Sequence, residues 1–247
     1  MAAPARRRFA PLGTTVEGMP SVQGIVFDMD GTLCEPQNYM FTEMRLLLNI
    51  PPQSDILGHI DTLPAAQQPS AHAAIREVER KAMAKQIPQP GLTTLMRYLD
   101  ERAVPKAICT RNFETPVRHL LETFLGEAAA FDPVLTRDFR PLKPDPAGIL
   151  HIARQWGLGE DASGVIMVGD SMDDMEAGRR AGAATVLLVN EFNRALAEHE
   201  CTDLVIGRLD ELVGILEKGF EGGRGVGAGA DGQGVARGEA FRKYNNK

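Results

Sequence analysis

Two aspartates follow a short apolar segment near the start of the chain, and their spacing suits phosphorus chemistry. Asp28 and Asp30 come directly after Gly24–Phe27, an apolar run that predicts a buried strand. Residues two positions apart share one side of an extended chain, so both carboxyl groups should face one pocket. One carboxylate can attack phosphorus and form an aspartyl-phosphate, while the other protonates the leaving oxygen and later deprotonates water. Taken alone, the pattern also fits an ordinary strand end followed by an Asp30-Gly31 turn.

A second acidic motif follows another apolar run. Asp170, Asp173 and Asp174 come after Val165–Val168, whose composition predicts a second buried strand. The carboxyl ends of parallel strands meet at one edge of an open α/β sheet, where ligands bind. Carboxylates gathered there repel one another unless a cation lies among them, and Mg²⁺ is a hard divalent ion that prefers such oxygen ligands. Taken alone, the motif fits a metal site and a helix start capped by Ser171 equally well.

A threonine and a lysine between these motifs complete a set of four signals. Thr110 follows a third apolar run, Ala107–Cys109, where a hydroxyl can hydrogen-bond a phosphate oxygen. Lys143 lies between Pro141 and Pro144, which fix the backbone, so its ammonium can neutralise a carboxylate and phosphoryl oxygens. Alone, Thr110 fits a turn and Lys143 fits a solvated loop. The four signals occur in order at or beyond the ends of predicted strands, which favours one shared site.

Predicted strands and helices alternate along most of the chain. The predicted strands cover Gly24–Phe27, Lys106–Cys109, Pro133–Leu135, Val165–Val168, Ala184–Val189 and Leu204–Ile206. The predicted helices cover Leu92–Arg102, Thr115–Leu125, Ala147–Trp156, Met172–Ala181, Asn193–Glu200 and Asp210–Glu217. This alternation requires crossover connections and therefore predicts the α/β class, with a mainly parallel sheet that has helices on both faces.

Residues 36–89 interrupt the alternation. Apolar side chains recur there at helical spacing, as at Met40, Met44 and Leu47, and a long polar helix is predicted over Ala71–Lys85. Prolines separate these segments, and the sequence shows no convincing strand. We therefore expect a small all-helical insert at 36–89, with a main domain formed by residues 21–35 and 90–218.

Composition and charge argue against several other classes of protein. The chain has 247 residues with 43% hydrophobic content, which is enough for one sizeable core and one small inserted module. The net charge is −6 and both ends are net positive, so the acidic body argues against binding of nucleic acid. No apolar run reaches the roughly 18 residues that span a membrane. Cys34, Cys109 and Cys201 are too few and too scattered for a disulfide framework or a zinc site.

Both ends of the chain are expected to be disordered. Residues 1–20 form a basic tail with three arginines at 6–8, and residues 219–247 form a Gly-rich tail with few apolar side chains. The arginines give a weak resemblance to a mitochondrial presequence, but prolines and a glycine interrupt any amphipathic helix there. We expect a cytoplasmic monomer, with the nucleus as a possible location and mitochondrial import as a minor alternative.

Together the four motifs resemble those of the haloacid dehalogenase-like (HAD) hydrolase superfamily. The matching residues are Asp28–Thr32, Thr110, Lys143 and Gly169–Asp174, within a resemblance that spans about residues 22–206. The resemblance implies a Rossmann-like core with a cap over the active site, and an insert directly after the first motif, such as 36–89, is one type of that cap. It also implies Mg²⁺ as the cofactor and a small phosphorylated metabolite as the partner.

The resemblance further implies a role for each catalytic residue. Asp28 resembles the nucleophile and Asp30 the general acid and base, while Lys143 resembles the residue that neutralises charge. The residues that would bind the substrate phosphate are Thr110, Arg111 and Asn112.

A metal site is also implied by the resemblance. The Mg²⁺ ligands would be the Asp28 carboxylate, the backbone carbonyl oxygen of Asp30, and Asp170. The spacing of the fourth motif selects Asp174 as its second acid, beside these ligands rather than among them. Asp173 would then lie outside the metal site or contact its ligands indirectly.

Four functions remain open at this point. The favoured one is a Mg²⁺-dependent phosphatase of a small phosphomonoester, and the first alternative is a phosphomutase of the same fold. A 2-haloacid dehalogenase would not need Asp30, and a non-catalytic binding module would not need the full motif set. Arg137 and Arg140 are expected in a solvated loop, with contact to a second anionic group of the substrate as the alternative.

Overall fold

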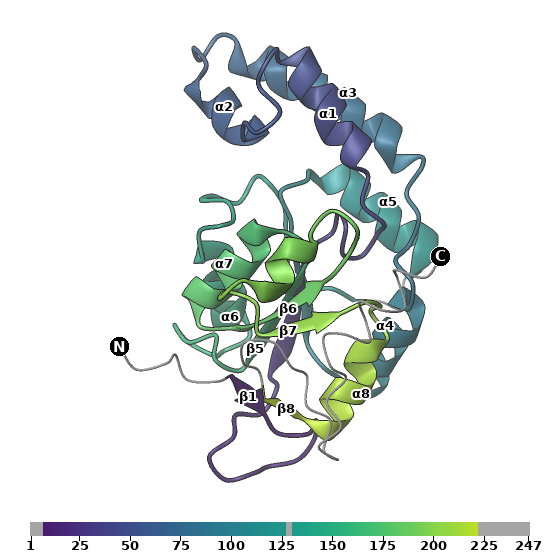
Figure 1. Ribbon diagram of the computed structural model, residues 1–247, viewed down its shortest axis with the longest axis vertical. Coiled ribbons are helices and arrows are strands. Elements are labelled where there is room, and N and C mark those ends of the chain that lie inside the picture. The colour runs from purple at the N-terminus through teal and green to yellow at the C-terminus, as the bar shows by residue number, and fades with distance from the viewer. Residues whose placement is uncertain (1–6, 127–129, 222–247) are drawn as a thin grey trace.

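A six-stranded parallel sheet forms the centre of the molecule (Figure 1). The computed structural model describes residues 7–126 and 130–221. The strands of the sheet are β2 (Gly24–Phe27), β3 (Lys106–Cys109), β4 (Val134–Leu135), β5 (Val165–Gly169), β6 (Ala184–Leu188) and β7 (Leu204–Ile206). Their order is β4-β3-β2-β5-β6-β7, which places β2 and β5 side by side in the middle. The predicted α/β class and parallel sheet are confirmed.

Helices cover both faces of the sheet because successive residues of a strand point to opposite sides. Ile25 and Phe27 of β2 pack into one hydrophobic cluster, and Val26 packs into another on the opposite face. The helices that contribute to the first cluster are α4 (Leu92–Glu101), α5 (Glu114–Phe124) and α8 (Glu211–Lys218). Those that contribute to the second are α6 (Ala147–Gln155) and α7 (Met172–Ala181). These helices differ from the predicted ones only at their ends.

Three further helices form a cap with a hydrophobic core of its own. They are α1 (Asn38–Leu47), α2 (Ile56–Thr62) and α3 (Gln68–Met83), and Figure 1 shows them as a group at one end of the molecule. The buried residues of the cap include Met44 of α1, Ile60 of α2 and Ile75 of α3. The expected all-helical cap is therefore present, and α3 starts three residues before the predicted polar helix.

The chain enters and leaves the cap through two crossings that are hydrogen-bonded to each other. The amide of Glu35 donates to the carbonyl oxygen of Ile87 (2.8 Å). The amide of Gln89 donates to the carbonyl oxygen of Leu33 (3.0 Å), and its side chain donates to that of Gly31 (2.8 Å). The crossings are thus fastened to the loop that follows β2.

The N-terminal segment is more ordered than expected. The structure corrects the disordered tail at 1–20 in its described part, because Arg8–Phe9 forms strand β1 and pairs with β8 (Phe220–Glu221). Phe9 and Phe220 are buried with their ring centroids 5.2 Å apart. Two isolated aromatic residues give no periodic pattern, so the sequence did not indicate this pair. The expected disorder of 1–6 and 222–247 lies outside the described residues.

The segment predicted as a helix at 193–200 is instead a short 3₁₀ helix, Arg194–Glu198. Its preceding residue is fixed from two sides. The side-chain nitrogen of Asn193 donates to the carbonyl oxygens of Leu188 (3.0 Å) and Asp170 (2.7 Å). This anchoring holds the start of the segment against the end of β6.

Candidate active site

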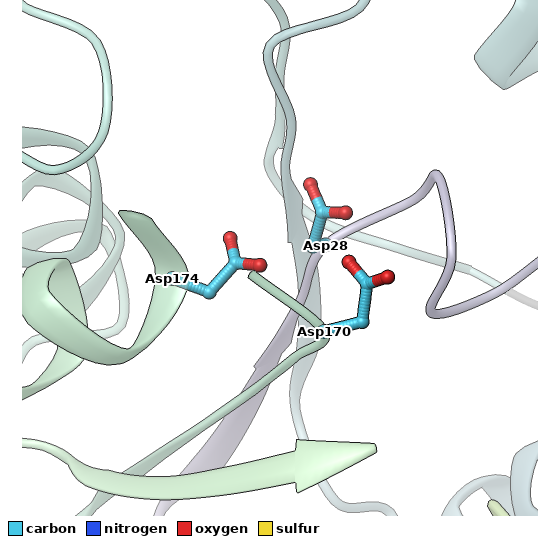
Figure 2. A group of neighbouring side chains, drawn as sticks. All are labelled: Asp28, Asp170 and Asp174. Carbon is cyan, nitrogen blue, oxygen red and sulfur yellow. The ribbon is translucent and has the colours of Figure 1, made fainter. Parts of the chain in front are cut away.

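Three aspartate side chains converge at the ends of the two central strands. β2 and β5 pair in parallel with Phe27 opposite Val168, so Asp28 and Asp170 leave the sheet at the same edge. Asp174 comes from the first turn of α7, and one carboxylate oxygen from each of the three lies within 4.8 Å of the others. Figure 2 shows the three carboxylates arriving from different segments. The structure thus brings together acids that are far apart in the sequence.

Lys143 joins this cluster as its buried cation. Its Nζ donates to Asp28 Oδ1 (2.7 Å) and to Asp174 Oδ1 (2.5 Å). Burial acts to lower the pKa of Lys143, but the carboxylates of Asp174 and Asp28 raise it above the ordinary lysine value. The lysine therefore stays charged throughout the physiological pH range.

Asp174 is fully engaged by other groups of the protein. Its Oδ2 accepts hydrogen bonds from the amide (3.0 Å) and hydroxyl (2.6 Å) of Ser171, and the Ser171 hydroxyl accepts from the Asp174 amide in return. This is a capping box that starts α7. Since Oδ1 of Asp174 accepts from Lys143, this carboxylate holds the lysine in place.

Two asparagines that the sequence analysis did not single out hold Asp170. Asn190 Nδ2 donates to Asp170 Oδ2 (3.1 Å), and Asn193 Nδ2 donates to the Asp170 carbonyl oxygen (2.7 Å). Both residues follow β6, the strand beside β5. The polar residues in the loop after β6 could have indicated this contact, because the loops at this edge of a parallel sheet lie around the ligand site.

The carboxylates of the cluster are poised to share a cation. Burial raises the pKa of Asp28 to about 7; Lys143 opposes this rise, and Asp174 and Asp30 add to it. Burial also raises the pKa of Asp170 well above its usual range, with repulsion from Asp174 and Asp28 adding to the effect. One lysine thus offsets only part of the negative charge. The donor set, carboxylate oxygens a few ångströms apart, fits a hard divalent cation such as Mg²⁺.

Asp30, Thr110 and Asn112 lie beside this cluster and are linked to one another. Asn112 Nδ2 donates to Asp30 Oδ2 (2.8 Å), and the Asn112 amide donates to Thr110 Oγ1 (3.1 Å). Burial raises the pKa of Asp30, against the lowering by the Asn112 hydrogen bond. The loop after β3 thus positions the second aspartate of the first motif.

Arg111 is placed differently from its neighbours in this loop. It forms ion pairs with Asp55 at the start of α2 and with Asp173 of α7. The guanidinium therefore joins the core to the cap, and Asp173 is a partner of Arg111 rather than of the carboxylate cluster. No sequence signal paired Arg111 with an acid on the cap.

Arg137 is not in a solvated loop, which corrects the sequence expectation. Its side chain is 3% exposed and forms an ion pair with the buried Glu79 of α3. Arg140 pairs with Asp61 of α2 (3.0 Å), and this contact is half-exposed. With the Arg111–Asp55 pair, three arginines of the core thus contact three acids of the cap. The prediction failed for Arg137 because its acidic partner lies on a distant helix.

Gly31 lets the loop after β2 pass close to Asp170. Its φ is +83°, and a Cβ at this position would overlap the Asp170 carboxylate. We expect Gly31→Ala to cost at least about 1–2 kcal/mol of stability, because an L side chain is strained at this φ. We also expect kcat/KM to fall about tenfold or more as Asp170 is displaced. Thermal unfolding and steady-state kinetics measure both effects.

Gly157→Ala is the matched control for this substitution. Gly157 has a similar φ of +78°, but an added Cβ would meet no atom within 4 Å. Gly157→Ala should lower the stability of the protein to a similar extent but should leave kcat/KM unchanged. Equal losses of kcat/KM in the two variants would contradict the assignment of the effect to the Asp170 contact.

Comparisons with known proteins agree with this arrangement. The profile of one family, described as haloacid dehalogenase-like hydrolase, matches residues 22–182. The chain belongs to this family. This HAD-like hydrolase is 45% identical to an uncharacterized hydrolase of Saccharomyces cerevisiae, over 82% of this chain and 94% of the relative. It is 26% identical to a phosphoglycolate phosphatase of Neisseria meningitidis serogroup A, over 77% of this chain and 92% of the relative.

The fold of this HAD-like hydrolase also matches solved structures. A protein of Bacteroides fragilis designated as a haloacid dehalogenase-like hydrolase superposes with a TM-score of 0.65. The match covers 78% of this chain and 100% of the other at 18% sequence identity, which shows a shared fold. Among the described residues, none of the helices combines the length and the apolar character needed to cross a bilayer.

Proposed function

We propose that this HAD-like hydrolase is a Mg²⁺-dependent phosphatase that acts on a small phosphomonoester through a phosphorylated Asp28. The observation that carries the proposal is the position of the Asp28 carboxylate. One oxygen of this carboxylate accepts a hydrogen bond from the buried Lys143, and the carboxylate lies beside Asp170. Asp30 lies close enough to raise the pKa of Asp28. The resemblance to a phosphoglycolate phosphatase supports the reaction class.

In the first step, an Asp28 oxygen attacks phosphorus and the bond between phosphorus and the leaving oxygen breaks. Asp30 donates its proton to the leaving oxygen. Burial makes Asp30 suited to this task, since a carboxyl group with a raised pKa retains a proton closer to neutral pH. The Lys143 ammonium offsets the negative charge that Asp28 and the phosphoryl oxygens bring together.

In the second step, water attacks phosphorus and the bond from phosphorus to Asp28 breaks, which releases phosphate. Asp30 accepts the proton of the attacking water and so returns to its starting state. Thr110, buried beside Asp30 and Asn112, presents its hydroxyl at the strand end where phosphoryl oxygens would lie. The proposed phosphate contacts are therefore Thr110 and Asn112, since Arg111 is occupied by two acids.

Asp28, Asp170 and the backbone carbonyl oxygen of Asp30 are the proposed ligands of Mg²⁺, and Asp174 orients Lys143 beside them. When bound, the ion would neutralise carboxylate charge and polarise the phosphoryl group. The fit rests on the spacing of the carboxylate oxygens and on the surplus of negative charge at the site.

Binding of Mg²⁺ should weaken as the pH falls. The ligand carboxylates must lose their protons before they bind a cation. Because burial raises the pKa of Asp28 to about 7, this group is mostly protonated at pH 6 and mostly ionised at pH 8. We expect the apparent Kd for Mg²⁺ to be roughly tenfold higher at pH 6 than at pH 8. Isothermal titration calorimetry with MgCl₂ measures this ratio, and a Kd that is constant or lower at pH 6 would contradict it.

The proposed function is tested by release of inorganic phosphate. The purified protein is assayed with Mg²⁺ on an aryl phosphate and on a panel of phosphorylated metabolites, and again with excess EDTA. We expect release that depends on Mg²⁺. Isomerisation of the phosphate ester without release would indicate a mutase instead. Halide release from a 2-haloacid that persists in EDTA would indicate a dehalogenase.

A further inference from the structure

Arg137 has buried hydrogen-bonding capacity that the protein itself does not use. Its Nη2 contacts Glu79 Oε1, but its Nε and Nη1 are buried without a hydrogen-bond partner in the described part of the chain. Glu79 Oε2 is also buried without a partner there. An arginine carries only donors, and buried donors without acceptors are costly. Such a residue is expected to meet an acceptor that arrives from outside.

Arg137 lies next to the proposed catalytic groups. Its amide donates to the Asn112 carbonyl oxygen (2.8 Å), and the Asn112 side chain donates to Asp30 (2.8 Å). The charge of Arg137 is also near enough to lower the pKa of Asp30. The guanidinium lies over the ring of Phe113, with its central carbon 5.5 Å from the ring centroid. Its contacts with Phe113 and Glu79 thus place the guanidinium at the boundary between the core and the cap.

Other arginines lie near Arg137, together with the acids Glu79 and Asp61. Burial lowers the pKa of His72 on α3. The nearby arginines Arg137, Arg76 and Arg140 lower this pKa further, and Asp61 raises it. Burial also raises the pKa of Glu79 to about 7, in spite of its ion pair with Arg137. The acid that balances Arg137 is thus weakened.

We propose that Arg137 binds a second anionic group of the substrate, a carboxylate or a further phosphate, while the phosphomonoester lies at Asp28. The inference rests on the proposed phosphatase function and narrows its substrates to phosphate esters that carry another negative group. Arginine suits this role because its planar guanidinium pairs with carboxylate and phosphate oxygens. Since Glu79 lies on the cap, the same contact would make binding of the second anion depend on the position of the cap.

The test compares matched substrates that differ only in the second group. Phosphorylated hydroxy acids with two to four carbons are each compared with the phosphorylated diol and with the bisphosphate of the same length. We expect that, for at least one chain length, the wild type has a kcat/KM for the carboxylate or the bisphosphate that is roughly 10- to 100-fold higher than that for the phosphorylated diol. The carboxylate and bisphosphate arms distinguish the two kinds of anion. Equal kcat/KM for anionic and uncharged substrates would overturn the proposal.

Three variants distinguish an Arg137 that binds the second anionic group, here called the receptor role, from an Arg137 that only forms a structural ion pair with Glu79. Arg137→Gln should lower the ratio of anionic to uncharged kcat/KM at least tenfold, whatever happens to the absolute rates. Glu79→Gln breaks the same ion pair but keeps the donors of Arg137, so the ratio should stay or rise. Arg140→Gln removes one charge from the same loop and should change the ratio less than twofold. A similar fall in the ratio for Arg137→Gln and Glu79→Gln would overturn the proposal, since both would act through the ion pair alone.

A binding measurement keeps this test apart from that of the proposed function. The same ligand pairs are titrated by calorimetry into Asp28→Asn and into the double variant Asp28→Asn/Arg137→Gln. Tighter binding of the anionic ligand that is lost in the double variant supports the receptor role even if no substrate is turned over. Conversely, release of phosphate from an aryl phosphate with no preference between the pairs would retain the phosphatase and reject the receptor.

Discussion

Replacing Asp28 with asparagine should lower the rate of phosphate release by at least about a thousandfold. The amide has nearly the same shape as the carboxylate, but it is neutral and cannot form the acyl phosphate bond. Release of phosphate from the aryl phosphate and from the best metabolite of the panel measures the effect. Intact-mass measurement after rapid quenching should detect a phosphorylated wild type and no phosphorylated variant.

The same substitution should leave the fold intact. Asp28 sits among Asp30, Asp170 and Asp174, and both burial and repulsion from its neighbours raise its pKa. Removing one of these charges in the absence of Mg²⁺ relieves repulsion, and Lys143 keeps its contact with Asp174. The Tm of the metal-free variant should therefore equal or exceed that of the wild type at pH 8. Retained turnover in a folded Asp28→Asn protein would reject covalent catalysis by this residue.

Lys143→Met should produce the largest loss of stability among the substitutions considered. The lysine is the buried partner of Asp28 and Asp174, and removal of one member of a buried ion pair costs about 3–5 kcal/mol. Urea unfolding of the metal-free protein at pH 8 measures this loss. Phosphate release should be lost as well, because Lys143 is the cationic side chain that donates a hydrogen bond to the attacking Asp28 carboxylate, and a neutral methionine cannot offset its charge.

The loss should depend on pH in a defined direction. Without Lys143, the pKa of Asp28 rises further above its unfolded value, because the lysine was the group that lowered it. A carboxyl group whose folded pKa is raised stabilises the fold at low pH, and this stability is lost as the pH rises through the folded pKa. The destabilisation of Lys143→Met relative to wild type should therefore be smaller at pH 5.5 than at pH 8. A loss that does not change between these pH values would contradict the assignment to unpaired carboxylates.

Lys106→Met is the matched control. Lys106 is also buried, but its partner Asp100 is partly exposed and can be hydrated once the lysine is gone. Lys106 begins β3, at the end of the strand opposite the cluster. Its substitution should cost less stability than that of Lys143 and should spare phosphate release.

The sequence predicted the centre of the site because strand ends are local signals. Asp28 and Asp170 each follow an apolar run, and parallel pairing of those runs brings the residues together without further information. Lys143 was found because prolines mark its loop as a fixed segment. The structure adds that both carboxylate oxygens of Asp174 accept hydrogen bonds, one from Lys143 and the other from Ser171. Asp174 therefore orients the lysine and is not proposed as a ligand of the metal ion.

The contacts between core and cap could not be predicted in the same way. Arg137 and Glu79 are 58 positions apart in the sequence, and neither has a neighbour whose spacing points to the other. A buried arginine in a loop reads from sequence as a solvated one, since arginine is rarely buried unless it is paired. The pairing of Phe9 with Phe220 was also not predicted, because a strand of two residues is too short to show an alternating pattern of apolar residues.

The two crossings into the cap connect it directly to the surroundings of the carboxylate cluster. They are bonded to each other and to the turn at Gly31, and that turn touches the carboxylate of Asp170. Because one short segment joins the cap to the surroundings of Asp170, we expect a displacement of the cap to move the Asp170 carboxylate as well.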